Sequence, residues 1–196
     1  MIDPRLLYTF NPEVWSSLDG VRPVLIHLFE GYVDAAAVNR NLATHILQHC
    51  EHEVLAEFDH DQLHDYRSRR PQMVFDTNSW VSMKDFSLLL YKVIDAAGTP
   101  FLLLVGPEPD SQWRRMTQAV LGIAERLHSA MLLTGSGVPM AVPHTRPTLV
   151  TSHSTDSKLA TGNPLWIDRV QIPGSFSAVL EFCAGQVGLT GLGFVA

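Results

Sequence analysis

The chain has 196 residues, of which 46% are hydrophobic and 17% are charged, so its composition fits a folded domain and excludes a disordered chain. Its formal net charge of -6 argues against a nucleic-acid partner, because phosphate binding needs a clustered basic surface. The length predicts a single domain over residues 1–196.

The cysteine pattern and the hydrophobic runs indicate the cellular compartment. Cys50 and Cys183 lie far apart and form neither a CxxC pair nor a disulfide ladder. No secretory signal opens the chain, and the apolar run 101–105 is far shorter than a membrane span. We therefore expect a cytoplasmic protein with reduced thiols and no membrane partner.

The first half of the chain predicts an α/β unit. Residues 1–23 carry several proline and glycine turn formers and predict irregular structure. Residues 24–29 predict a buried strand that ends at Glu30 and Gly31. Asp34 is a candidate N-cap for an amphipathic helix that runs to about Cys50, because apolar residues recur there every three or four positions.

A β-hairpin is predicted after the second strand. Residues 53–59 form that strand, and the polar loop 60–71 separates it from a third strand at 72–77. The β-rich run 86–94 returns antiparallel to it, so residues 72–94 predict a hairpin inserted into the α/β plan. An isolated two-stranded ribbon cannot hide this much apolar surface, so we expect the hairpin to pack against another subunit.

The second half continues the α/β pattern. The continuous apolar run 101–105 predicts a central strand covered on both faces, and a helix is expected to begin near Pro109. Further strands are expected at 131–134, 148–152, 168–172 and 192–196, with a last helix at 176–187. The order predicts an α/β fold with a mixed, mainly parallel sheet and helices on both faces.

Three segments carry a family resemblance: FDHDQLHDYRSRRP at 58–71, GPEPDSQW at 106–113 and GVPMAVPHTRP at 137–147. Together they resemble the actinobacterial branch of the proteasome assembly chaperone 2 family, over essentially the whole chain from about Val24. The resemblance implies a core like that of nucleoside phosphorylases and peptidyl-tRNA hydrolases, a homotrimer, and a helical lid region after the core. The chain ends inside an apolar run where that region would begin, so we expect the lid to be absent. Ala36 departs from the glycine common in the family.

Polar residues follow several of the predicted strands. Because ligands of open α/β sheets bind at the carboxyl ends of strands, these loops predict one cleft. The candidate ligand-binding residues are Asp34, Asp59, Asp61, Tyr66, Arg67, Arg70, Glu108, Asp110, His144, Thr145 and Arg146.

Structural roles compete with each of these assignments. Asp59 and Asp61 equally fit turn caps, and Glu108 and Asp110 fit the first turn of a helix. Arg146, in a loop stiffened by prolines, fits either ligand binding or an ion pair with Glu108. The basic run 67–70 is flanked by aspartates, which favours a solvated face or an internal ion-pair network.

Metal, nucleophile and cofactor motifs are weak. His60 and His64 approximate the HExxH pattern, but Asp61 replaces the glutamate and no third ligand follows, so no metal is expected. Ser136 lies between two glycines without the GxSxG spacing, and a pairing with His144 is a minor alternative. The glycines at 185–193 precede a strand, so no dinucleotide cofactor is expected.

The sequence favours a homo-oligomeric protein that binds a small polar ligand or a protein partner in a cleft at the strand ends. One rival hypothesis is a nucleoside-phosphorylase-like or hydrolase-like enzyme with His144 as acid or base and Arg146 or Arg67 holding an anion. Another is an assembly chaperone, which predicts an exposed apolar patch.

Overall fold

A computed structural model of the protein describes residues 2–141, 143, 145–160 and 169–196. The helices and strands are η1 (Pro4–Leu7), β1 (Tyr8–Phe10), α1 (Pro12–Ser16), β2 (Leu25–Glu30), η2 (Ala35–Ala37), α2 (Val38–His49), β3 (Glu51–Phe58), α3 (His60–Leu63), β4 (Gln72–Asp76), β5 (Ser79–Lys84), β6 (Leu88–Ile94), β7 (Pro100–Pro107), α4 (Trp113–Arg126), β8 (Leu132–Ser136), β9 (Thr151–Ser154), α5 (Phe176–Gln186) and β10 (Gly191–Val195).

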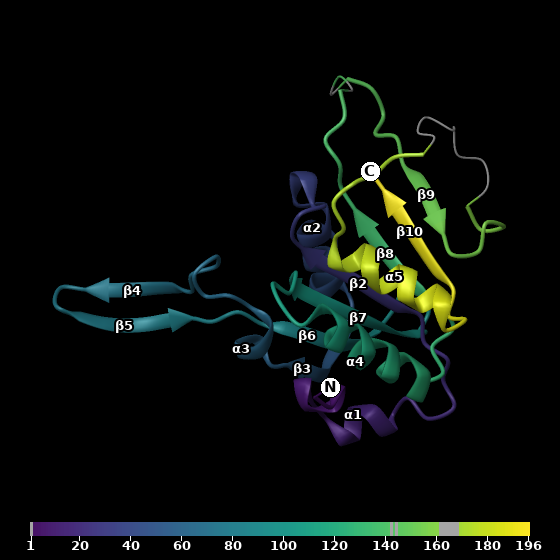
Figure 1. The fold of residues 1–196 in the computed structure, drawn as a ribbon. Helices are drawn as coiled ribbons and strands as arrows, with labels where there is room; N and C mark the ends of the chain where they lie inside the picture. Colours follow the sequence, from purple (N-terminus) through teal and green to yellow (C-terminus); the bar gives the residue numbers. More distant parts are fainter. Residues whose placement is uncertain (1, 142, 144, 161–168) are drawn as a thin grey trace.

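Eight strands form one sheet in the order β1-β3-β6-β7-β2-β8-β10-β9 (Figure 1). Strand β2 pairs in parallel with β7 and β8, and β8 pairs in parallel with β10. Strand β6 is antiparallel to β3 and β7, while β1 and β9 are antiparallel edge strands. Strands β2, β3, β7, β8 and β10 therefore point the same way, and the predicted mixed, mainly parallel sheet is confirmed.

Helices cover both faces of the sheet, as predicted. Leu102 and Leu104 of β7 join a core cluster with Met116 of α4 and Phe176 of α5. Leu103 points to the other face, where it packs in the cluster that includes Ala43 of α2. Because successive strand residues face opposite sides, the unbroken apolar run of β7 is what a central strand between two helical layers requires.

The predicted hairpin at 72–94 is wrong in its second strand. Strand β4 pairs with β5, and the β4–β5 hairpin forms a separate two-stranded sheet that projects from the body (Figure 1). Residues 88–94 instead form β6, between β3 and β7 in the main sheet. The side chains of Leu88, Leu90 and Val93 are buried there, so core packing decides their place.

Other boundaries also differ from the predictions. The N-terminal 23 residues contain η1, β1 and α1. Helix α4 begins at Trp113 and not near Pro109, and the strand predicted at 148–152 lies at Thr151–Ser154. Residues 169–172 form no strand, and Asp168 lies outside the described residues. The extent of the domain and the absence of a lid region stay predictions.

No helix in the described part of the chain is long and apolar enough to cross a bilayer.

Candidate functional site

The strand order creates a crevice where the chain leaves β2 and β7. These strands are parallel neighbours, but β2 leads into α2 on one face of the sheet and β7 leads into α4 on the other. The loops diverge at the carboxyl ends of the two strands, which is the switch point where open α/β sheets bind ligands. Gly31 follows β2 here and Glu108 follows β7.

A cleft of about 730 Å³ opens at this point, and we call it the switch-point cleft. Strands β2, β8, β9 and β10, helix α5 and their connecting loops line it. Its apolar lining includes Phe29, Val33, Val138, Ile172, Ala178, Phe182 and Val195. Its polar lining includes Asn39, Glu108, Thr134, Ser136, His153, Ser154, Ser175, Ser177 and Glu181.

Glu108 is the sequence-predicted residue that lines this cleft. Its side chain accepts hydrogen bonds from the backbone N–H of Tyr32 at 3.1 Å and of Phe176 at 2.5 Å. Phe176 is the first residue of α5, so the carboxylate stabilises the start of that helix, and not of α4 as predicted. A Cβ atom on Gly31 would lie 2.3 Å from Oε2 of Glu108, so only glycine fits at that position.

A side-chain contact that the sequence did not predict joins β9 and α5 in the lining of the cleft. Nδ1 of His153, on β9, lies 3.0 Å from Oε1 of Glu181, on α5. Two glycines of β10 make room for it, because a Cβ atom on Gly191 would meet the Glu181 side chain and one on Gly193 would meet the His153 ring. Glycines at alternate positions of a predicted strand were the available sequence signal.

Helix α2 contributes a third polar group. Nδ2 of Asn39 donates to the carbonyl of Phe29 at the end of β2, while its Oδ1 has no hydrogen-bond partner among the described residues. Asp34 accepts the backbone N–H of Asn39 at 2.7 Å, so its carboxylate caps the first turn of α2. The N-cap role predicted for Asp34 is therefore present, and the group that it caps is the backbone N–H of Asn39.

The predicted residues at 59–70 form a separate cluster and do not line the switch-point cleft. Asp59 accepts the backbone N–H of Asp61, as a turn cap does. The Tyr66 hydroxyl donates to Asp61, and this hydrogen bond, with partial burial and the negative charge of Asp61, raises the pKa of Tyr66 to about 12. Arg67 and Arg70 are exposed.

Asp110 belongs to the same cluster. Its carboxylate accepts the backbone N–H of Asp65 and pairs with Arg69 at 3.2 Å. It therefore holds the loop after α3 against the end of β7, which supports the interpretation of the basic run as an internal ion-pair network. The two histidines of the zinc-like pattern have other partners: Nε2 of His60 lies 3.2 Å from Asp85, and Nε2 of His64 lies 3.2 Å from the Pro107 carbonyl.

Among the described residues of the proline-rich loop after β8, the predicted Thr145 and Arg146 do not line the cleft. Thr145 and Arg146 are exposed, and the backbone N–H of Arg146 donates to the carbonyl of Pro143. In the described part of the chain Arg146 forms no ion pair with Glu108. His144 lies outside the described residues.

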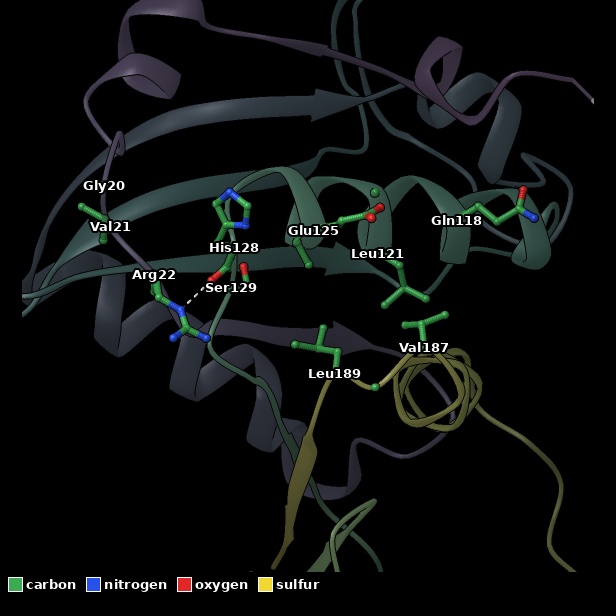
Figure 2. A pocket seen from close by; sticks show the side chains of 13 residues that line it. Gly20, Val21, Arg22, Gln118, Leu121, Glu125, His128, Ser129, Val187 and Leu189 are labelled. Carbon is green, nitrogen blue, oxygen red and sulfur yellow. Dashed lines mark hydrogen bonds between the residues drawn. The ribbon is translucent and has the colours of Figure 1, made fainter.

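A second groove of about 820 Å³ lies near the amino ends of β2, β8 and β10, between the end of α4, the turn after α5 and the segment before β2. Figure 2 shows Leu121, Val187 and Leu189 on one side of it. Arg22 donates there to the carbonyl of His128 at 3.5 Å, as the dashed line in Figure 2 marks. None of the sequence-predicted site residues lines this groove.

The fold and the switch-point cleft define an α/β protein with a crevice at the carboxyl ends of its strands, and comparisons with known proteins place it in a family. The model of the PAC2 family matches residues 28–196, so the chain belongs to the PAC2 family. This confirms the family resemblance inferred from the sequence. Among proteins with curated descriptions, none matches significantly.

Solved structures show the same architecture. A protein of unknown function from Mycobacterium tuberculosis is 43% identical with a TM-score of 0.88, and the match covers 96% of this chain and 67% of that one. A Corynebacterium glutamicum protein of unknown function is 35% identical with a TM-score of 0.84, covering 97% and 72%. A proteasome-assembly chaperone homologue from M. tuberculosis shares the fold at 20% identity, with a TM-score of 0.80 and coverage of 88% and 74%.

Proposed function

We propose that this protein works by binding other polypeptides and that its copies associate through the β4–β5 hairpin. The observation that carries the proposal is the composition of one hairpin face. Met73 lies opposite Met83 in the ladder and Phe75 lies opposite Trp80, so these four side chains share a face. Their exposed fractions lie between 46% and 64%.

The other face of the hairpin is different. Gln72 lies opposite Lys84, and Asp76 lies opposite Ser79, with Val74 and Ser82 between them. A ribbon with one polar and one apolar face is the pattern of an element that has one face covered. Two-stranded hairpins are marginally stable alone, so covering these side chains stabilises the hairpin as well as the complex.

Covering the apolar hairpin face favours association. Burying a large apolar side chain completely is worth about 1.5–3 kcal/mol, so covering the exposed half of one is worth roughly 1 kcal/mol. Phe75 and Trp80 pack edge to face with their ring centroids 5.0 Å apart, so they already form one preorganised patch. The homotrimer implied by the family resemblance is the expected assembly.

Relatives support a role in association. One structural neighbour is described as a proteasome-assembly chaperone homologue and another, from Pyrococcus furiosus, as an archaeal proteasome activator. A chaperone-like role for this chain is consistent with an exposed apolar face. Free Cys50 and Cys183 fit the proposed cytoplasmic location.

Native mass spectrometry of the protein purified from its own host tests the proposal. The double variant Phe75→Ser, Trp80→Ser removes the aromatic patch, and Val74→Ser is the matched control because Val74 is similarly exposed on the opposite face. We expect a multimer for the native protein and the control and a monomer for the double variant. A double variant with the native assembly would refute the proposal.

The switch-point cleft favours a second binding role, for a small ligand. Its enclosed apolar lining and convergent polar groups are the usual features of such sites. The same mass spectra test this role, because a bound ligand adds a constant mass to each copy. Bare protein in every spectrum would count against it.

An enzymatic role has less support than binding. Arg146 is exposed and does not line the cleft. Nδ1 of His27 lies 3.4 Å from the Ser177 hydroxyl, but burial lowers the pKa of His27 to about 3, so its imidazole is a poor base near neutral pH. We expect no phosphate-dependent cleavage of a nucleoside panel, and cleavage of any member would revive the enzyme hypothesis.

A further inference from the structure

The charges that line the switch-point cleft are mainly negative. Glu108 and Glu181 line it, each only 8% exposed, and the single basic side chain in the lining is His153, which pairs with Glu181. No lysine or arginine lines the cleft among the described residues. The remaining residues of the chain, 1, 142, 144 and 161–168, contain neither residue type. An anionic ligand therefore meets carboxylates without a cation to offset them.

Three hydroxyl groups of the lining have already committed their protons. Ser154 donates to the carbonyl of Gly191 at 2.6 Å, Thr134 to that of His27 at 3.1 Å, and Ser136 to that of Phe194 at 3.5 Å. Each hydroxyl oxygen keeps acceptor capacity after donating its proton. Each of these three hydroxyls therefore presents an acceptor and no free proton to a ligand.

Two further acceptors are open to a new partner, and one of them, Oδ1 of Asn39, is buried. Asn39 is 2% exposed, lines the cleft, and its Oδ1 has no partner among the described residues. Glu181 uses Oε1 in its bond to His153, and no bond to its Oε2 exists within the described part of the chain. A buried acceptor without a donor is costly, so a ligand that brings an N–H group gains at Asn39, and Oε2 of Glu181 offers it a carboxylate acceptor.

The geometry points to a small organic amine as the ligand of the switch-point cleft, with its N–H groups donated to the Glu181 carboxylate and its apolar body against the aliphatic and aromatic lining. This inference rests on the proposed ligand-binding role of the cleft. Phe29 at the end of β2 and Val195 at the end of β10 belong to the apolar lining. A protonated amine supplies a positive charge and N–H donors, which a carboxylate accepts in a charge-assisted hydrogen bond.

Isothermal titration calorimetry with three matched probes tests the inference. Tryptamine, indole-3-propionate and 3-ethylindole share one apolar body and differ in carrying an ammonium, a carboxylate or no charge. We expect tryptamine to bind at least about tenfold more tightly than indole-3-propionate, as one charge-assisted hydrogen bond can provide. Equal or tighter binding of the carboxylate would overturn the inference and leave the ligand-binding role standing. Failure of all three to bind would overturn both.

A pair of variants locates the effect. Glu181→Gln keeps an acceptor for His153 but removes the charge, so we expect it to weaken tryptamine binding about tenfold and to leave 3-ethylindole unaffected. Glu125→Gln makes the same change in the second groove, between α4 and the turn after α5, and should change the affinity for neither probe. Unchanged tryptamine affinity in folded Glu181→Gln protein, checked by circular dichroism, would overturn the assignment.

Discussion

His27 lies on β2 with its side chain wholly buried, and this burial lowers the pKa of its imidazole to about 3 from an ordinary value of 6.5. Its Nδ1 lies 3.4 Å from the Ser177 hydroxyl, and its Nε2 has no partner among the described residues. The folded protein therefore holds this histidine neutral, whereas an unfolded chain protonates it as soon as the pH falls below 6.5.

The sign of the pH effect follows from this difference. Between the two pKa values the unfolded chain binds one more proton than the folded protein. The free energy of unfolding therefore decreases as the pH is lowered, until the folded-state pKa is reached. The slope from one such group is roughly 1.4 kcal/mol per pH unit, which amounts to about 2.7 kcal/mol over two pH units inside that window. Stability contributed by neutral His27 is thus complete above about pH 6.5 and lost toward about pH 3.

Urea unfolding of the native protein and of His27→Gln, at several pH values within this window, measures the effect. Glutamine is neutral throughout and still offers an acceptor to the Ser177 hydroxyl. All other titrating groups are common to both proteins, so the difference between the two slopes isolates His27. We expect the native protein to lose stability more steeply on acidification by roughly 1.4 kcal/mol per pH unit. Parallel slopes would refute the reasoning.

Four further substitutions test single positions. Glu108→Ala removes the acceptor of two backbone N–H groups and should cost about 2–4 kcal/mol in urea unfolding, and native-like stability would contradict the role of Glu108 at α5. Gly106→Ala should destabilise strongly in thermal unfolding, because φ is +147° and a Cβ atom would lie 2.5 Å from a backbone oxygen. Gly122 lies in the middle of α4 with no atom within 4 Å of the place of a Cβ, so Gly122→Ala should instead stabilise the protein by about 0.5–1 kcal/mol. A change in stability of the same sign for both glycine substitutions would contradict the account. Asp61→Asn should return the pKa of Tyr66 from about 12 toward about 10 in a phenolate absorbance titration, and an unchanged titration curve would contradict the hydrogen bond.

Much of the fold could be predicted because local pattern and tertiary role agree. The apolar run at Leu102, Leu103 and Leu104 encodes a strand buried on both faces, and all three side chains are wholly buried. The run at Leu88 and Leu90 carries the same β signal, but its partners β3 and β7 are chosen by long-range packing that local pattern does not encode.

The site was predicted less completely, for a related reason. Glu108 was predicted as a site residue because it closely follows the apolar run 101–105, which clearly indicates a strand. Its acidic character also suggested the start of the next helix along the chain, whereas it caps α5, 68 residues away in sequence. His153 and Glu181 were missed because each lies in an unremarkable segment, and only the strand glycines Gly191 and Gly193 signalled the space they occupy.

The central claim is that the β4–β5 hairpin is the contact between copies. Hydrogen–deuterium exchange across a dilution series tests it most directly, because no other strand in the described part of the chain pairs with β4 or β5, and the hairpin projects from the body (Figure 1). The account predicts that residues 72–84 gain protection as concentration rises, while the β7 amides stay protected throughout. An assembly that forms with the hairpin exchanging freely at every concentration would contradict it.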